Sequence, residues 1–180
     1  MSGVPTMSKQ WVVFQVNGQE YGLSVDQVIE VLRMALLTPV AEAPRGFAGI
    51  LNLRGNAVPV LDLVERLGGV HRDAGLDQAI VIVMIDNRLV GLVVDAVDEV
   101  VDLDEDSIRP ADALLGSSNN YLGVARLKNA DTKEELEENY RVILLIDVDR
   151  LVRSEWSRLG GSRAMQLGLG GGNQAEPIGR

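Results

Sequence analysis

The sequence contains no cysteine, which excludes disulfide bonds, thiolate metal sites and a cysteine nucleophile. Histidine is almost as rare: His71 is the only one, and it stands in a polar stretch that has the character of a connector. A site built from two histidines is therefore excluded, and His71 is expected to be a solvated loop residue. The lack of cysteine, together with the lack of an apolar signal segment at the start, predicts a cytoplasmic protein.

The sequence also has few basic residues and no long apolar run. Seventeen basic residues stand against 26 acidic ones, for a net charge of −9, so the surface repels phosphate backbones and anionic lipids. The longest uncharged apolar run within the domain, AIVIVMI at residues 79–85, is far too short to span a membrane. We therefore expect no nucleic acid as a partner and no direct insertion into a membrane.

No group of residues has the pattern of a catalytic, metal or cofactor site. Asp102, Asp104 and Asp106 have the spacing of a calcium loop, but Ser107 and Ala113 stand where such a loop needs glycine and glutamate. The glycine-rich stretch near the C-terminus neither follows a strand nor opens a helix, as a phosphate-binding loop would. The sequence thus predicts no enzymatic activity, no metal and no cofactor, and favours an interaction module.

What the sequence does have is an internal repeat. The segments GLSVDQVIEV at 22–31 and GLVVDAVDEV at 91–100 are identical at seven of ten positions. Hydrophobic residues make up 46% of the chain and aromatic residues only 4%, and Val-rich runs alternate with turns of Asn, Asp and Gly. Such runs predict strands joined by hairpins. We expect one domain, residues 11–152, built from two units of about five strands, at about 11–68 and 79–152.

Each predicted unit could form a small closed sheet but would bury only a marginal core by itself. Two β-barrels packed together, with a strand or helix exchanged between them, are therefore predicted; the alternative is a single sandwich whose halves are similar by chance. Asp62 and Asp147 are expected to cap the helix that ends each unit, and Glu65 completes a capping-box pattern with Asp62. Segments expected outside the core are the flexible tails 1–10 and 160–180 and the acidic loop or short helix 128–139.

Arg54 stands at the mouth of a tight turn in GILNLRGNAVPVLDL, residues 49–63. Glycine and asparagine follow it, and both tolerate positive φ, so the turn needs only small residues. In a chain with excess acidic residues, this long cation is either a solubilising charge at a hairpin tip or a contact for a partner. We expect Arg54 to pair with an acidic group, either Glu30 in the free protein or a carboxylate of the partner.

Four stretches together resemble the CheW family of bacterial chemotaxis adaptors. They are EYGLSVDQVIEV, TPVAEAPRGFAGILNLRGNAVPVLDLVERLG, VIVMIDNRLVGLVVDAVDEVVDL and VILLIDVDRLV, and they run from about Trp11 to Val152. The resemblance implies a mainly β fold of two SH3-like five-stranded barrels over a shared apolar core, with short helices and a C-terminal helix. It implies a non-enzymatic adaptor, associated with membrane-bound receptor arrays through its partners. These partners would be the cytoplasmic tip of a chemoreceptor and the regulatory domain of a CheA-type histidine kinase.

By position, the resemblance puts Val28, Glu30 and Arg54 on the receptor-binding surface, near the junction of the two lobes. Val28 has an equal claim as a core residue, because its repeat equivalent is also a valine. Ile29 is the cleaner surface candidate, because its equivalent is Asp98. The expected receptor-binding residues are therefore Val28, Ile29, Glu30 and Arg54.

Two alternative functions are consistent with the same sequence. One is a CheW-like adaptor of a pilus-based, twitching-motility or other non-flagellar chemosensory array. The other, of a different class, is a small-ligand-binding β-barrel protein, although a barrel of five strands is normally filled by its own side chains. Identifying the proteins that co-purify with the chain from native cells would separate the three.

Overall fold

The computed structural model describes residues 8–69, 75–112, 120–128 and 140–158, and in these ranges the chain is mainly β. The strands are β1 (Ser8–Val16), β2 (Gln19–Ser24), β3 (Val28–Arg33), β4 (Phe47–Leu53), β5 (Asn56–Asp62), β6 (Ala79–Ile85), β7 (Arg88–Val94), β8 (Ala96–Asp104), β9 (Ile108–Pro110), β10 (Tyr121–Lys128) and β11 (Tyr140–Ile146). The helices are α1 (Leu63–Arg66), α3 (Val148–Arg158) and the 3-10 turns η1 (Val25–Gln27) and η2 (Glu105–Ser107). The predicted mainly β class, with short helices and a C-terminal helix, is confirmed.

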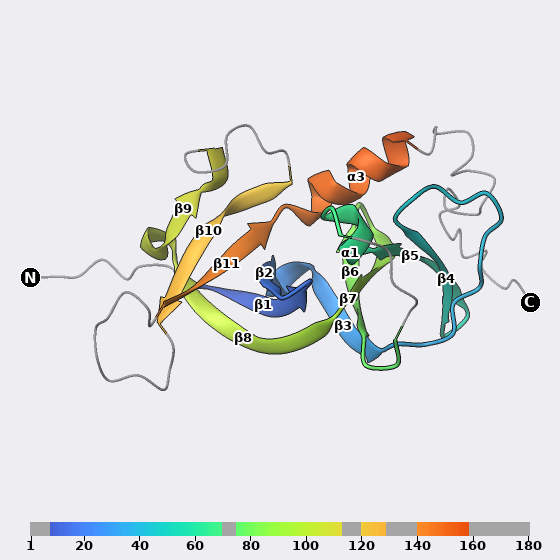
Figure 1. Cartoon of the computed structure of the whole chain (residues 1–180), viewed down its shortest axis with the longest axis horizontal. Coiled ribbons are helices and arrows are strands. Elements are labelled where there is room, and N and C mark those ends of the chain that lie inside the picture. Colours follow the sequence, from blue (N-terminus) through green and yellow to red (C-terminus); the bar gives the residue numbers. More distant parts are fainter. Residues whose placement is uncertain (1–7, 70–74, 113–119, 129–139, 159–180) are drawn as a thin grey trace, which may run out of the picture.

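The strands form two sheets, and each sheet takes a hairpin from the other half of the chain (Figure 1). The six-stranded sheet has the order β8-β1-β2-β11-β10-β9, and the five-stranded sheet has the order β3-β6-β7-β5-β4. The hairpin β1-β2 thus lies among strands of the second half, and the hairpin β6-β7 lies among strands of the first. We call the two sheets with their enclosed side chains the six-stranded lobe and the five-stranded lobe.

The internal repeat is visible strand by strand in this topology. In repeat terms β1 to β5 correspond to β6, β7, β8, β10 and β11, and with that substitution the two sheet orders become the same apart from β9. The exchange is made by two equivalent parallel pairings, in which Gly22 lies opposite Leu145 and Gly91 lies opposite Val60. These glycines belong to the repeated segment, so the same local sequence makes the same crossover twice.

Two details differ from the predicted pair of five-stranded barrels. One lobe has a sixth strand, β9. Among the described residues backbone pairing closes neither sheet, because the end strands β3 and β4 are not paired with each other, nor are β8 and β9. Residues 8–10, expected in a flexible tail, pair with β8. Residues 1–7, 129–139 and 160–180, for which tails and an acidic loop were expected, lie outside the described residues.

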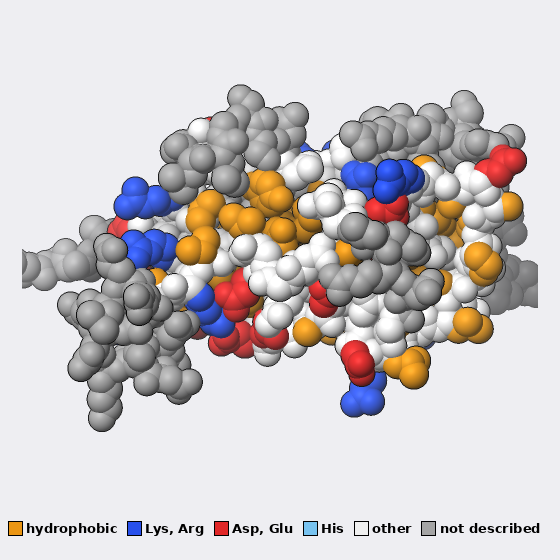
Figure 2. All heavy atoms as spheres, in the orientation of Figure 1, with side chains coloured by type: hydrophobic (Ala, Val, Ile, Leu, Met, Phe, Trp, Pro, Cys, Tyr) orange, Lys and Arg blue, Asp and Glu red, His pale blue; other side chains and the backbone are white. Residues whose placement is uncertain are grey.

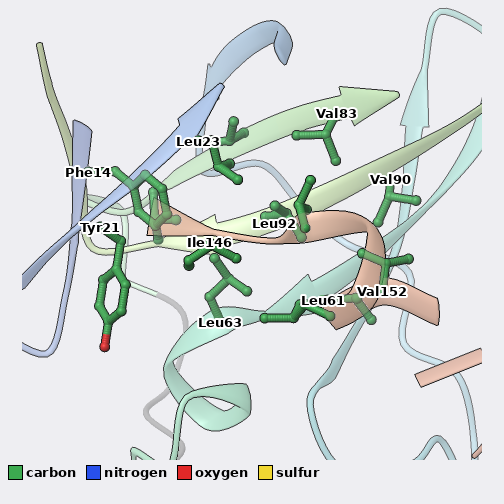
Figure 3. Close-up of a cluster of buried hydrophobic side chains, with 14 of the residues drawn as sticks. Phe14, Tyr21, Leu23, Leu61, Leu63, Val83, Val90, Leu92, Ile146 and Val152 are labelled. Atoms are coloured by element: carbon green, nitrogen blue, oxygen red, sulfur yellow. The ribbon is translucent and has the colours of Figure 1, made fainter. Parts of the chain in front are cut away.

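Three buried clusters hold the fold together, and the largest lies between the lobes (Figure 3). This inter-lobe core takes side chains from both sheets and from α1 and α3, among them Phe14, Leu23, Leu92 and Ile146. The interior of the six-stranded lobe is a second cluster, around Trp11. The interior of the five-stranded lobe is a third, built from Leu51, Val58, Val60, Ile80, Ile82 and Val93. The exchanged hairpins contribute to all three clusters, so neither lobe has a core that is built from one half of the chain alone.

The predicted helix caps at Asp62 and Asp147 are confirmed, but the predicted capping box is wrong. Asp62 accepts hydrogen bonds from the backbone N–H groups of Val64 and Glu65, and Asp147 accepts one from Arg150. Glu65 does not complete the box with the Asp62 N–H, which donates to the carbonyl oxygen of Gly46. The Glu65 carboxylate instead accepts from the Gly46 N–H, at 2.9 Å. Glu65 thereby fixes the start of β4 against α1, a tertiary contact that a four-residue pattern does not contain.

Candidate functional site

The residues expected at the site are arranged by a β-bulge in β3. Val28 lies opposite Val83, but Glu30 lies opposite Ile82, so Ile29 is an extra residue in the pairing with β6. A bulge reverses the alternation of side chains along a strand. Val28 therefore faces the inter-lobe core with Val83, whereas Glu30 faces the same side as Ile82, toward the interior of the five-stranded lobe.

The same bulge separates the roles of Val28 and Ile29. Val28 is partly buried and packs against the inter-lobe core, which supports its claim as a core residue. The Ile29 side chain is 50% exposed, as expected of the surface candidate. The repeat equivalent, Asp98, is likewise the extra residue in β8, because Val97 and Glu99 lie opposite adjacent residues of β1. The repeated pattern V-x-E-V thus encodes a bulge in both lobes.

Arg54 itself occupies a strained position in the hairpin between β4 and β5. The turn has two central residues, and both have positive φ, 51° at Arg54 and 87° at Gly55. The left-handed conformation costs a residue with a side chain about 1 kcal/mol or more, and asparagine or aspartate lowers this cost. Two other hairpins of the chain follow that preference, with Asn17 and Asp86 at the same place. The conformation of the turn therefore does not explain why an arginine occupies this position.

The guanidinium of Arg54 forms a bidentate ion pair with Glu30. Its two terminal nitrogens donate to the two carboxylate oxygens at 3.1 and 3.0 Å. Glu30 is on β3 and Arg54 follows β4, so the pair joins the two end strands of the five-stranded sheet. The expected pairing of Arg54 with Glu30 is confirmed for the free protein.

The pair is unequally exposed, and this limits its contribution to stability. The Arg54 side chain is 77% exposed and the Glu30 side chain 23%. An ion pair so open to water contributes roughly 0.2–1 kcal/mol. Most of the Arg54 side chain remains accessible to solvent, and Ile29, the neighbour of Glu30 in β3, is half exposed. A cation and its carboxylate partner therefore lie at the edge of the five-stranded lobe, and an exposed apolar residue precedes the carboxylate in β3.

An analogous ion pair in the six-stranded lobe was not anticipated. Arg141 of β11 donates to Glu99, the repeat equivalent of Glu30, and also to Glu20 of β2, at 3.1 Å. The Arg141 side chain is 26% exposed, far less than that of Arg54. Glu99 could have been singled out by its place in the repeat. Arg141 could not, because its position in the strand pairing corresponds to Asn56 rather than to Arg54.

The outer faces of the two lobes differ in spite of the repeat. Hydrophobic side chains gather over β10 and β11 in Figure 2, where Leu122 is 47% exposed and Val142 44%. The register places Ala48 and Ala57 at the equivalent positions of β4 and β5, where Ala48 packs against the interior of the five-stranded lobe. Acidic side chains follow β8 on the same view. The duplication has therefore produced two lobes with distinct surfaces, which a partner can tell apart.

Within the described ranges, neither a metal centre nor a membrane-spanning helix is present. No group of three or more histidine, aspartate or glutamate residues within them could hold a metal ion. Within the same ranges, no helix has both the length and the apolar character needed to cross a bilayer. The arrangement of Ile29, Glu30 and Arg54 at the edge of the five-stranded lobe is the strongest candidate for a functional site.

Comparison with known proteins agrees with the motifs and with the fold. The family model described as a CheW-like domain matches residues 10–155. Chemotaxis protein CheW of Klebsiella aerogenes is 29% identical over 167 residues, covering 86% of this chain and 93% of that protein. Protein FrzA of Myxococcus xanthus is 30% identical over 89 residues, 49% of this chain and 56% of its own length.

A solved structure gives the same result in three dimensions. The crystal structure of the scaffolding protein TtCheW from Thermoanaerobacter tengcongensis matches with a TM-score of 0.68 and 34% sequence identity, covering 81% of this chain and 92% of that one. The family match extends over nearly the whole described fold and includes both copies of the repeat. The chain belongs to the CheW-like family of chemotaxis scaffold and adaptor proteins.

Proposed function

We propose that this protein is a non-enzymatic adaptor that couples chemoreceptors to a CheA-type histidine kinase, and that it works in the cytoplasm beside membrane-bound receptor arrays. The receptor tip contacts the edge of the five-stranded lobe through Ile29, Glu30 and Arg54, while Val28 supports this edge from the inter-lobe core. The absence of cysteine and the net charge of −9 are consistent with a cytoplasmic protein that avoids nucleic acid and anionic lipid.

The observation that carries the proposal is the exposed, bidentate pair of Arg54 with Glu30. Arg54 is held in an unfavourable backbone conformation, yet its side chain adds little to stability. Arginine is common among the residues that dominate binding energy at interfaces. A receptor carboxylate that takes part in this pair would convert an exposed ion pair into a desolvated one, which contributes more.

Substitution of Arg54 by glutamate tests the receptor contact. Arg54→Glu is expected to fold normally but to weaken binding to a coiled-coil fragment of a chemoreceptor tip by about 2 kcal/mol or more, roughly thirtyfold. Arg45→Glu is the matched control, because Arg45 also forms an exposed ion pair, with Glu65, and the change of charge is the same. Circular dichroism checks folding. Equal affinities for Arg54→Glu and the wild type would make Arg54 a solubilising charge.

A second candidate function within the family is supported by the similarity to FrzA. In this case the chain serves a pilus-based or other non-flagellar array rather than a flagellar one. The same ion pair and the same surface would be used, since the fold and the motifs are common to both. Co-purification from native cells, with the captured receptor and kinase identified, distinguishes the two systems.

A further inference from the structure

The turn that presents Arg54 is held by a side chain from the strand before it. Asn52 of β4 accepts at Oδ1 a hydrogen bond from the backbone N–H of Gly55, at 2.9 Å. The strand ladder ends with the pair of Leu53 and Asn56, so it does not use this N–H group. The Asn52 side chain therefore fixes the peptide that joins Arg54 to Gly55.

This support is needed because of the residue that occupies the turn. In two other hairpins the first left-handed position is filled by Asn17 or Asp86, whose short polar side chains adopt this conformation readily. Arg54 has no such side chain, although its φ of 51° is close to the 53° of Asn17 and the 48° of Asp86. Asn52 supplies from the strand the polar contact that Arg54 cannot supply itself.

The repeat provides an internal control for the role of Asn52. Gly49 and Gly123 occupy the same register in β4 and β10, which makes Arg126 the equivalent of Asn52. Arg126 makes a different contact, over the ring of Tyr140 at 4.7 Å. A strand at this place in the fold does not require asparagine. The asparagine is therefore associated with the turn of Arg54 rather than with the sheet.

We propose that Asn52 is a positioning residue for the receptor contact, acting through Arg54. The inference rests on the proposed function. With Oδ1 in place, the turn stays left-handed and the guanidinium remains in reach of Glu30 or of a receptor carboxylate. Without this acceptor the turn adopts other conformations, and affinity falls in proportion to the fraction of molecules that still present Arg54 correctly.

The first measurement needs no partner. Asn52→Ala is expected to accelerate hydrogen exchange of the Gly55 amide in the full-length protein, because its hydrogen-bond acceptor is lost. Asn56→Ala is the matched control: Asn56 is an exposed asparagine at the start of β5, directly after the turn, and its substitution should leave the exchange of Gly55 unchanged. Unchanged exchange in Asn52→Ala would refute the structural half of the inference.

The second measurement is a double-mutant cycle of binding to the receptor-tip fragment. Asn52→Ala is expected to weaken binding about three- to tenfold, and Asn52→Asp, which keeps the acceptor oxygen, to restore most of the loss. In an Arg54→Ala background, Asn52→Ala should change affinity by less than about twofold. An equal loss in both backgrounds would show that Asn52 acts on the fold and would refute the inference.

The cycle also separates failure of the inference from failure of the proposed function. If Arg54→Ala binds the fragment as tightly as wild type, the proposed receptor contact is wrong and the positioning role is refuted with it. If Arg54→Ala weakens binding and Asn52→Ala does not, the receptor contact stands and only the role of Asn52 is refuted. Melting temperatures of all variants exclude a loss of folded protein as the cause.

Discussion

Truncating one side chain inside the five-stranded lobe is expected to destabilise the six-stranded lobe by the same amount. Each lobe contains a hairpin from the other half of the chain, and the two share the inter-lobe core. Unfolding the five-stranded lobe would release the hairpin β6-β7, which belongs to the second half of the chain. Unfolding the six-stranded lobe would release the hairpin β1-β2, which belongs to the first half. We therefore expect a single cooperative transition for the whole fold.

Ile82→Ala is the perturbation that tests this coupling. Ile82 lies in the middle of β6, is completely buried, and belongs to the interior of the five-stranded lobe. Truncation of a buried isoleucine to alanine costs about 2–5 kcal/mol, the lost transfer energy plus the energy of the cavity. In a protein of this size each kcal/mol lowers the melting temperature by roughly 2–4 °C. At about 3 kcal/mol the expected decrease is ~6–12 °C.

Trp11 reports on the unfolding of the six-stranded lobe. It is 4% exposed and belongs to the interior of the six-stranded lobe. The sequence has two tryptophans, so a Trp156→Phe background makes Trp11 the sole source of tryptophan fluorescence. The midpoint from Trp11 fluorescence should fall with Ile82→Ala as much as the midpoint from far-ultraviolet circular dichroism. Val100→Ala, at a 55% exposed valine, is the control and should shift neither midpoint by more than about 2 °C.

A particular result would refute the coupling. If Trp11 fluorescence kept its wild-type midpoint in Ile82→Ala while circular dichroism showed an earlier transition, the lobes would unfold independently. Calorimetry would then resolve two peaks rather than one. The inter-lobe core would in that case be an interface between two independently folding domains, and the exchange of hairpins would not couple their unfolding.

Two further predictions concern polar groups. Arg141→Ala should lower the free energy of unfolding by about 1–2 kcal/mol, because it removes the cation that Glu20 and Glu99 share, whereas Arg54→Ala should cost less than about 1 kcal/mol. Urea titrations of both variants at low and high salt measure these costs, and equal costs would contradict the prediction. Burial, with the neighbouring Tyr121, raises the pKa of Tyr21 from 10.0 to about 12. The folded state thus resists ionisation that the unfolded state undergoes, so stability should be complete below about pH 10 and fall as the pH rises toward 12. Tyr21→Phe should flatten the pH dependence of the urea midpoint, and an unchanged slope would assign it to other groups.

Much of the candidate site was accessible from sequence alone. Arg54 is conspicuous because a cation occupies a turn that small residues would serve better, and Glu30 belongs to the repeated segment. Their pairing was predicted and is present. What local patterns could not contain is the left-handed φ of Arg54 itself, its support by Asn52, and the second ion pair of Arg141. Each depends on strand register, which is set by pairing between distant segments.

The sequence by itself determined the β class, the duplication at matched positions, the helix caps at Asp62 and Asp147, and the turns. All of these depend on residues that are close together along the chain, where side-chain type and backbone preference act directly. An exchange of a strand or helix was expected, but only the tertiary structure decided that a whole hairpin is exchanged in each direction and that the sheets stay open. It also decided that Val28 faces the inter-lobe core while Glu30 faces the lobe interior. The physical reason is the repeat. Because the two hairpins are equivalent, local sequence does not determine whether each one pairs with its own half of the chain or with the other half. The arrangement that buries more apolar surface in the complete fold is the one that forms.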